Sequence, residues 1–442
     1  MGVDGNVGGV TDRRRSTPRT DRVLADPRLR EAAARVGERL VKGAVRQALE
    51  KCRTGDISPA DVADEAVRLV PTRATSMRAV VNATGVVVHT NLGRAALSDA
   101  AVDAMTIAAG STDVELDLRT GRRSSRGRST LAALSEAVPE AEAVHVVNNG
   151  AAALALVTCA LAMGRSIVVA RGEMVEIGDG FRIPELVESV GATLREVGTT
   201  NRVRLADYEA AIDDDTAFVL KVHPSNFVVE GFTSTVPVAE LASLPVPVVA
   251  DIGSGLLAPH PRLPDEPSAS ATLRAGADLV TASGDKLLGG PQCGLLLGRA
   301  DLVERLRRHP FARALRVDKL TLAALEATLT GPPTPVARAL SSSADDLLVR
   351  AEKLAAELNE VVPAEAVASV AAVGGGGAPG VEIPSAAVSL PPDLAAGLRL
   401  GDPPVVGYVA RGRLLLDLIT VPPDHDAVLA DAVRRAAGSR EV

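Results

Sequence analysis

The chain has 442 residues, of which 46% are hydrophobic and 23% are charged. This length fits two or three domains of about 150 residues each, and the composition excludes a disordered or collagen-like chain. Aromatic residues make up only 2%, with no Trp, which argues against a nucleic-acid module that stacks bases on an aromatic platform. The net charge is −7, yet residues 1–80 hold 16 Lys and Arg against 11 Asp and Glu, so this segment carries +5 and the remainder −12.

The cysteines and the apolar runs predict a cytoplasmic protein without a membrane segment. Cys52, Cys159 and Cys293 are widely separated and odd in number, which fits neither a disulfide framework nor a metal site. The longest nearly unbroken apolar run covers residues 151–163, whereas a membrane-spanning helix needs about 20 residues. The N-terminus shows no apolar signal segment, so we expect no export.

The basic N-terminal segment predicts a small helical domain over residues 1–76. Apolar residues recur at helical spacing from Leu29 to Cys52, and Ser58-Pro59 followed by Asp61 resembles the start of a helix that runs to about residue 70. A basic module on an acidic body raises the question of a polyanionic partner. From charge alone, an ordinary solvated helix surface is the better explanation.

From residue 77 to 335 the pattern predicts a large α/β domain. Short apolar runs recur at 143–147, 166–170, 217–222, 247–250, 279–282 and 294–297, and helical stretches such as 151–163, 184–190 and 205–212 lie between them. Strands that are apolar on both faces and alternate with helices indicate a mostly parallel sheet covered by helices on both faces.

The remaining residues, 336–442, predict a small α/β C-terminal domain. After three prolines a helical pattern covers 336–358, a Gly-rich hinge follows at 374–377, and strand patterns at 381–390, 405–410 and 413–420 precede a final helix at 424–437. Residues 375–380 formally match the dinucleotide fingerprint G-x-G-x-x-G. We reject that match because the motif precedes a strand, whereas the fingerprint must open a helix that binds the pyrophosphate.

Three segments of the large domain combine into a candidate site. Asn149, Gly150 and Ala151 follow a strand and open a helix, whose free N–H groups and positive end suit a phosphate. Asp251 lies at the carboxyl end of a buried strand, where open α/β sheets bind ligands. Lys286 lies in a Gly-flanked loop just after another strand, where lost hydration would lower its pKa and make it a nucleophile for aldehydes.

Each segment has an ordinary alternative, namely a common strand-to-helix turn, a helix cap at Asp251 and an exposed loop lysine at Lys286. Together they describe a site for pyridoxal 5′-phosphate (PLP), in which the helix end binds the phosphate, Asp251 pairs with the pyridine nitrogen and Lys286 forms the Schiff base. Ser283, in the lysine loop, joins Asn149 and its neighbours as a candidate cofactor contact.

Several longer motifs carry a family resemblance. They are NATGVVVHTNLGRA (82–95), RGEMVEIGDGFRIP (171–184), EVGTTNR (196–202), KVHPSNF (221–227), DIGSG (251–255), SGDKLLGGPQCG (283–294), HPFARALRVDKLTLAALEATL (309–329), VGGGGAPGVEIPS (373–385) and GDPPVVG (401–407). The chain resembles the bacterial L-seryl-tRNA(Sec) selenium transferases, or selenocysteine synthases, over nearly its whole length. The resemblance implies a fold-type-I PLP enzyme that converts Ser-tRNA(Sec) to selenocysteinyl-tRNA(Sec) with selenophosphate, through β-elimination to an aminoacrylyl-tRNA and addition of selenium.

The resemblance also implies roles for individual residues and partners. Lys286 would carry the cofactor, and Arg94, Arg313 and Arg316 would line the active site and bind the anionic selenium donor. Residues 1–76 would grip the tRNA, and the chains would assemble as a large homo-oligomer with active sites between subunits. For the three arginines, ordinary surface ion pairs are the alternative, and His89 and His223 are at least as readily structural as functional.

Two other functions remain open from the sequence. One is a PLP-dependent lyase of the same superfamily that acts on a free amino acid or an amino sugar phosphate. The basic module at residues 1–76 argues against it, because such a lyase has no need of tRNA. The other is a catalytically idle tRNA-binding protein, which the presence of Lys286 and Asp251 makes less plausible.

Overall fold

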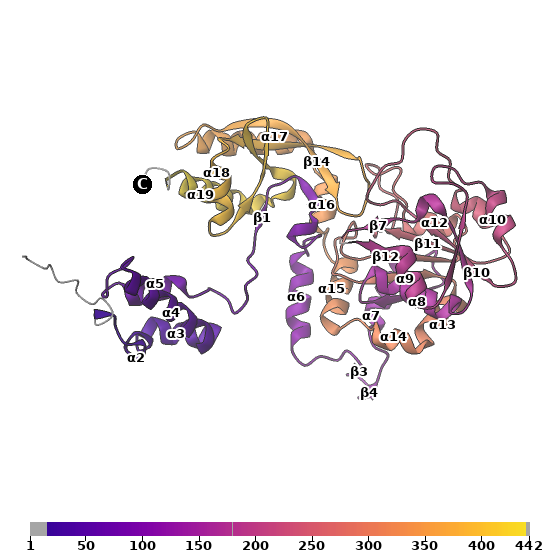
Figure 1. Cartoon of the computed structure of the whole chain (residues 1–442), viewed down its shortest axis with the longest axis horizontal. Coiled ribbons are helices and arrows are strands. Elements are labelled where there is room, and N and C mark those ends of the chain that lie inside the picture. The colour runs from indigo at the N-terminus through magenta and orange to yellow at the C-terminus, as the bar shows by residue number, and fades with distance from the viewer. Residues whose placement is uncertain (1–15, 179, 439–442) are drawn as a thin grey trace, which may run out of the picture. The chain divides into compact units, whose positions relative to one another are not determined.

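The computed structural model describes residues 16–178 and 180–438. The chain divides into two compact units, residues 1–79 and 80–442, and Figure 1 shows the helices and strands of each. In the described residues, no helix is both long enough and apolar enough to cross a membrane.

The N-terminal unit is helical, with α2 (Thr20–Leu24), α3 (Pro27–Val36), α4 (Glu38–Thr54) and α5 (Val62–Leu69). Gly37, at φ 90°, ends α3 and precedes α4, so the helical pattern expected from 29 to 52 is two helices rather than one. Val45, Ala48 and Val62 are completely buried between the helices. The unit therefore has a hydrophobic core of its own.

A seven-stranded sheet is the centre of the second unit, in the order β5-β13-β12-β11-β10-β6-β9. Only β13 runs antiparallel to its neighbours, which confirms the predicted mostly parallel sheet. The strands are β5 (Ala143–Val147), β6 (Ser166–Ala170), β9 (Thr193–Val197), β10 (Thr216–Val222), β11 (Val248–Gly253), β12 (Leu279–Ser283) and β13 (Gly294–Gly298).

Helices cover both faces of this sheet, as the alternating pattern predicts. One face packs against α8 (Gly150–Ala162), α9 (Ile183–Ser189), α13 (Ala300–Arg308) and α14 (Pro310–Ala314). The other packs against α7 (Arg128–Ala137), α10 (Leu205–Ala211), α11 (Val238–Leu241), α12 (Ala269–Arg274) and α15 (Lys319–Thr330). Further short elements are α6 (Asp99–Ala109), η1 (Thr90–Leu92), η2 (Arg171–Glu173), the hairpin β3 (Leu116–Asp117) and β4 (Arg122–Arg123), and the hairpin β7 (Glu176–Ile177) and β8 (Phe181–Arg182).

The strand registers bring the candidate segments to one edge of the sheet. Asp251 lies opposite Val222 on β10 and Thr281 on β12. Gly294, at the start of the antiparallel β13, lies opposite both Ser283 and Val147. The carboxyl ends of β5, β10, β11 and β12 therefore share one edge, the position where open α/β sheets bind ligands.

A five-stranded sheet, in the order β17-β18-β15-β14-β2, forms the C-terminal region. Its strands are β2 (Val86–Val88), β14 (Glu365–Gly374), β15 (Glu382–Leu390), β17 (Tyr408–Ala410) and β18 (Arg413–Asp417). It packs against α17 (Ala344–Leu358), and α16 (Pro335–Ser341), α18 (Leu394–Leu400), α19 (Asp426–Gly438), η3 (Leu418–Thr420) and η4 (Pro423–His425) complete the region.

Two details of this region differ from the sequence pattern. The helix expected over 336–358 is interrupted, because Ser343 caps a new helix, α17, by accepting a hydrogen bond from the N–H of Asp346 at 3.4 Å. β1 (Val81–Asn82) pairs with β16 (Val405–Val406), and β2 pairs with β14. Residues 81–88, assigned by pattern to the large domain, thus form strands with the C-terminal region.

Candidate active site

Lys286 lies in a tightly fixed loop after β12. The N–H of Leu287 donates to the carbonyl of Ser254 at 2.8 Å, and the N–H of Gly290 donates to the carbonyl of Gly284 at 2.9 Å. These bonds tie the lysine loop both to itself and to the loop that follows β11. The Lys286 side chain is therefore held at the carboxyl edge of the sheet.

The surroundings of Lys286 favour its neutral amine. Burial lowers the pKa of Lys286, and the nearby positive charge of Arg94 acts in the same direction, whereas the carboxylates of Asp251 and Asp285 raise it. Burial is the largest of these causes. The direction agrees with the expectation for a lysine in a Gly-flanked loop, because a neutral amine is the form that attacks a carbonyl carbon.

Asp251 is part of β11 rather than a helix cap. Its Oδ1 accepts a hydrogen bond from the Thr281 hydroxyl at 2.9 Å, and its carbonyl accepts one from the N–H of His223 at 3.0 Å. The next helix, α12, is capped by Ser268, so the capping alternative for Asp251 is wrong. Burial raises the pKa of Asp251, while the Thr281 hydrogen bond and the charge of Lys286 favour the carboxylate.

The N-terminus of α8 and Ser283 form a candidate phosphate cradle. Asn149 caps the helix by accepting a hydrogen bond from the N–H of Ala152 at 2.8 Å. A Cβ on Gly150 would lie 2.5 Å from Ser283 Oγ, so glycine is what lets the helix end approach the serine. The first N–H groups of a helix have no partner within it, and those of Gly150 and Ala151 are available at the positive end of α8.

Arg94 reaches the lysine loop from a distant part of the sequence. Its Nη1 lies 2.6 Å from Oδ2 of Asp285, and the N–H of Ala95 donates to the carbonyl of Asp285 at 3.2 Å. Arg94 itself has φ 67°, in the left-handed region that is uncommon for residues other than glycine. This contact places a guanidinium group near Lys286, and the role of Arg94 at the site stays a prediction.

Arg313 and Arg316 are exposed, and the backbone around Arg316 lies beside the end of β5 that leads into the cradle. Arg316 forms an isolated bridge with Val147, and the N–H of Asn148 donates to the carbonyl of Leu315 at 3.1 Å. The Arg316 side chain faces Glu115, with 3.7 Å between nitrogen and oxygen. In the described part of the chain, neither arginine forms an ion pair or hydrogen bond with the lysine loop, and their role at the site stays a prediction.

The two candidate histidines differ in their surroundings. The Nδ1 of His89 accepts a hydrogen bond from the N–H of Asn91 at 3.2 Å, which caps a short turn. His223 instead follows β10 beside Asp251, and its Nε2 lies 3.1 Å from Oε2 of Glu266. His89 thus has a structural partner, whereas His223 belongs to the edge that carries the candidate site.

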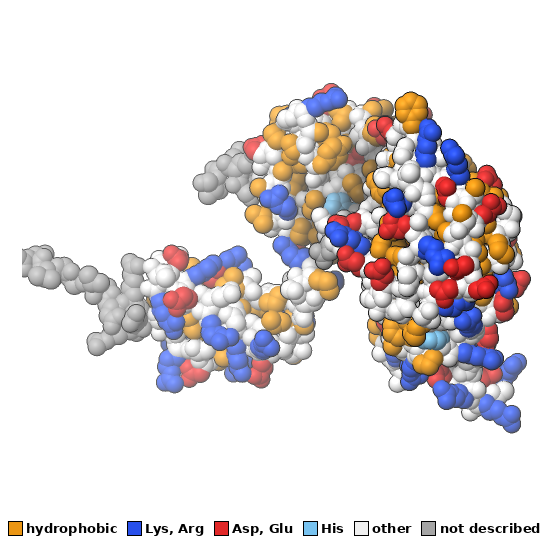
Figure 2. All heavy atoms as spheres, turned by 45° about the vertical axis from the view of Figure 1, so that its right-hand side comes forward, with side chains coloured by type: hydrophobic (Ala, Val, Ile, Leu, Met, Phe, Trp, Pro, Cys, Tyr) orange, Lys and Arg blue, Asp and Glu red, His pale blue; other side chains and the backbone are white. Residues whose placement is uncertain are grey.

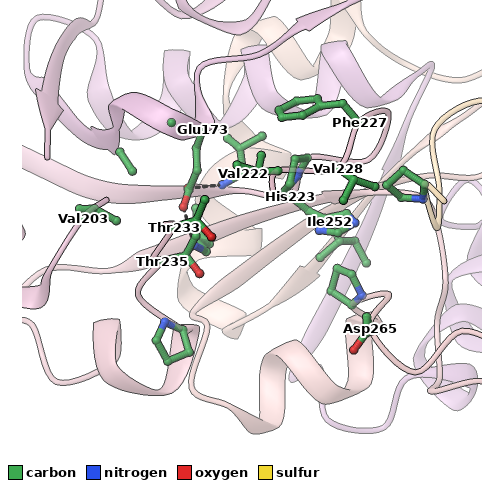
Figure 3. Close-up of a pocket in the computed structure, with 18 of the residues that line it drawn as sticks. Glu173, Val203, Val222, His223, Phe227, Val228, Thr233, Thr235, Ile252 and Asp265 are labelled. Carbon is green, nitrogen blue, oxygen red and sulfur yellow. Dashed lines mark hydrogen bonds and ion pairs between the residues drawn. The ribbon is translucent and has the colours of Figure 1, made fainter. Parts of the chain in front are cut away.

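A cavity of about 680 Å³ reaches this edge. Its lining includes Asp251 and His223 together with an ion pair between the buried Glu173 and the half-buried Lys221. Figure 3 shows Glu173 and Asp265 on opposite sides of the cavity, with His223 between them. The candidate site therefore adjoins a hollow large enough for a small-molecule group.

Some residues of the site were not singled out by the sequence. Thr281 and Asp285 lie inside the strand and loop that were recognised, but their partners Asp251 and Arg94 are distant in sequence. Glu266 lies in no recognised motif, and no local signal could have found it. It becomes visible only through its contacts with His223 and the C-terminal region.

Profiles of known families match almost the whole chain. One described as L-seryl-tRNA selenium transferase covers residues 80–422, and one described as the N-terminal region of selenocysteine synthase covers residues 14–53. The chain belongs to the L-seryl-tRNA selenium transferase family. The family resemblance seen in the motifs is thus confirmed.

Individual relatives in the selenium transferase family support this membership. The chain is 41% identical to the L-seryl-tRNA(Sec) selenium transferase of Geobacter sulfurreducens, an alignment that covers 95% of this chain and 98% of the relative. It is 42% identical to the enzyme of the same name from Moorella thermoacetica, with 96% of each chain covered. The selenium transferase family is therefore matched along both units of the chain.

A solved structure confirms the predicted fold class. D-glucosaminate-6-phosphate ammonia-lyase aligns with a TM-score of 0.58 at 19% identity, covering 83% of this chain and 97% of that one. The shared architecture is that of fold-type-I PLP enzymes. At this identity the likeness concerns the fold alone.

Proposed function

We propose that this chain is a PLP-dependent L-seryl-tRNA(Sec) selenium transferase, which converts L-seryl-tRNA(Sec) to L-selenocysteinyl-tRNA(Sec) with selenophosphate. The observation that carries the proposal is the meeting of Lys286, Asp251 and the N-terminus of α8 at one sheet edge, in a member of this family. A lyase of a free amino acid or amino sugar phosphate is not favoured, because the relatives matched over nearly the whole chain are named selenium transferases.

The residues at this edge fit pyridoxal 5′-phosphate. The N–H groups of Gly150 and Ala151 and the hydroxyl of Ser283 suit its phosphate, Asp251 suits a protonated ring nitrogen, and Lys286 suits the covalent bond to its aldehyde. When bound, this cofactor supplies an electron sink for negative charge at the α-carbon of an amino acid. The seryl group is such an amino acid, so the fit agrees with the proposed substrate.

Lys286 and Asp251 have separate tasks in the proposed reaction. With the cofactor and the seryl group bound, Lys286 would be the base that removes the proton from the seryl α-carbon, because burial favours its neutral amine. Asp251, as a carboxylate that accepts a hydrogen bond from the Thr281 hydroxyl, would hold a proton on the ring nitrogen of the bound cofactor. The seryl hydroxyl would leave as water, and selenium from selenophosphate would add at the β-carbon, while the phosphoryl group of the donor takes up a water and leaves as phosphate.

The donor is a phosphate-bearing anion, and Arg94, Arg313 and Arg316 are proposed to bind it. A guanidinium group binds phosphate oxygens through two parallel hydrogen bonds and stays charged. Arg94 is supported by its contact with Asp285 beside Lys286. Arg313 and Arg316 are exposed, and we propose that they complete the donor site when the chains associate as a large homo-oligomer with active sites between subunits.

We also propose a separate function for each domain of the chain. Residues 1–76 bind the tRNA, residues 77–335 hold the cofactor, and residues 336–442 form the small C-terminal domain. The basic balance of residues 1–80 supports the first assignment. The position of Lys286, Asp251 and α8 in the central sheet supports the second.

Selenium incorporation by the purified protein tests the proposed function. With PLP and selenophosphate, we expect selenium to be transferred to Ser-tRNA(Sec) and not to Ser-tRNA(Ser). Release of pyruvate from free serine or of ammonia from an amino sugar phosphate, without any selenium transfer to tRNA, would favour the lyase instead.

Two exposed arginines on α4 give a specific test of tRNA binding. Arg39 and Arg46 have no ion pair or hydrogen bond among the described residues, whereas the neighbouring Lys42 is paired with Glu38 at 2.6 Å. Figure 2 shows Lys and Arg side chains on the surface of the N-terminal unit. We expect the double variant Arg39→Ala and Arg46→Ala to weaken binding of Ser-tRNA(Sec) by about 10-fold or more at 0.15 M salt and to reduce the slope of log K against log salt by about one unit per lost phosphate contact.

A variant outside α4 controls for the loss of an exposed arginine that the described residues leave unpaired. Arg399, on α18, is also exposed and has no ion pair or hydrogen bond within the described ranges, so Arg399→Ala should leave the affinity and the salt slope unchanged. Equal affinities of all three proteins for Ser-tRNA(Sec), measured by filter binding, would show that α4 does not contact the tRNA. Cofactor absorbance should be the same in each protein.

A further inference from the structure

The loop between β14 and β15 lies directly against Lys286. Gly376, at φ 86°, leaves so little room that a Cβ there would be 2.5 Å from Lys286 Nζ and 2.6 Å from Cε. A Cβ on Gly377 would lie 3.0 Å from Leu287 Cδ1 and 3.1 Å from Ser254 Cβ. The glycine loop, defined here as residues 374–380, thus forms one wall around the lysine amine.

Glu266 connects this wall to the strand edge that carries Asp251. Its side chain is only 1% exposed, and its Oε2 accepts a hydrogen bond from the N–H of Ala378 at 2.6 Å. The same oxygen lies 3.1 Å from Nε2 of His223. A carboxylate has no proton to donate, so Nε2 of His223 is the donor. The N–H of His223 in turn donates to the Asp251 carbonyl.

We propose that Glu266 is a positioning residue that fastens the glycine loop over Lys286 and thereby confines the lysine amine beside Asp251. This inference rests on the proposed function in one respect only, namely that Lys286 is the reactive lysine. It adds a role for the C-terminal region, because Ala378 and Gly376 belong to the connection between β14 and β15. Removing the hydrogen bond between Glu266 and Ala378, two residues that lie 112 positions apart in sequence, should therefore change the chemistry of Lys286.

The negative charge of Glu266 and its hydrogen bond to the glycine loop have opposite effects on the pKa of Lys286. The groups around the amine are Asp251, Asp285 and Glu266, whose charges raise the pKa of Lys286, and Arg94, whose charge lowers it. Burial, to which the glycine loop contributes, lowers it as well. Loss of the Glu266 charge alone should lower the pKa of Lys286, whereas release of the loop should admit water and raise it.

Two substitutions separate these effects. In Glu266→Gln the amide oxygen still accepts from Ala378, but the charge is gone. In Glu266→Ala both the charge and the acceptor are gone. Because the two variants lose the same charge, the difference between their Lys286 pKa values measures the effect of the hydrogen bond that fastens the loop.

The readout is the reactivity of Lys286 in the full-length, cofactor-free protein. Brief labelling with acetic anhydride across a range of pH, followed by mass spectrometry, gives a titration midpoint for Lys286 relative to the exposed Lys353. We expect Glu266→Gln to move the midpoint down and Glu266→Ala to move it up from that of Glu266→Gln. Identical titration midpoints of Lys286 in the two variants would overturn the proposal. This result does not depend on which reaction the enzyme catalyses.

A glycine pair keeps the proposal testable if Glu266→Ala does not fold. Gly376→Ala and Gly380→Ala both place alanine at a positive φ in the same loop, but the nearest atom to a Cβ on Gly380 is Val228 Cγ2 at 3.3 Å. We expect Gly376→Ala to weaken binding of pyridoxal phosphate by at least about 10-fold relative to Gly380→Ala, since its Cβ displaces the amine. Equal affinities would show that the loop does not confine Lys286.

Discussion

Replacement of Lys286 by alanine is expected to abolish covalent binding of pyridoxal phosphate and to lower selenium transfer by at least about 10³-fold. Lys286 is held by the hydrogen bonds of its loop, and burial lowers its pKa, so no other lysine is as well placed to react. Borohydride reduction of the wild-type protein should attach the cofactor to the peptide that contains Lys286. Mass spectrometry of the digest locates the adduct.

Lys353→Ala is the control for this experiment. Lys353 is exposed on α17, and its loss should change neither the cofactor absorbance nor the turnover. An adduct on a lysine other than Lys286 in the wild-type protein would remove Lys286 from the mechanism. Full turnover of Lys286→Ala would do the same.

The second large effect is expected for Asp251→Asn, which should lower turnover by about 10²-fold to 10⁴-fold while the fold is kept. Asparagine has nearly the same shape and can still accept from Thr281, but it cannot balance a positive charge on the ring nitrogen. Steady-state rates and the spectrum of bound cofactor give the comparison.

The stability of the Asp251→Asn protein without cofactor provides an independent measurement. Burial raises the pKa of Asp251 in the folded chain, so the ionised form costs stability above that pKa and the cost disappears as the pH falls. The asparagine variant has no such cost, and we expect it to melt no lower than the wild type at neutral pH. A variant that melts normally and turns over at the wild-type rate would assign Asp251 a purely structural role.

The central sheet could be predicted closely because its strands are buried on both faces. The runs at 143–147 and 166–170 coincide with β5 and β6, in which His145 and Ser166 are the only polar residues. β9 was not predicted, since it lies at the sheet edge and carries Arg195 and Glu196. β14 was missed for a different reason, because it is rich in alanine, which is depleted in strands, and only Ala371 and Val373 of its residues are buried.

The residues of the candidate site also fall into those that the local sequence predicts and those that only the fold reveals. Lys286, Asp251 and Asn149 could be proposed from the sequence because each follows or ends a recognisable strand. The pairing of Arg94 with Asp285 spans 191 positions, so only the fold reveals it. The roles of Arg313 and Arg316 stay predictions, since their exposed side chains make no contact with the lysine loop in the residues that the structure describes.

The pairing of β2 with β14 has a consequence for how the protein is made. Val86 and Val88 pair with Ala372 and Gly374, so β2 leaves the ribosome long before its partner has been translated. The helical N-terminal unit has its own core and can fold as soon as it emerges. The backbone of β2, in contrast, stays unpaired until β14 has been translated. The glycine loop takes its place beside Lys286 only after the C-terminal region has been translated, and the nascent chain therefore has no finished lysine pocket during most of its synthesis.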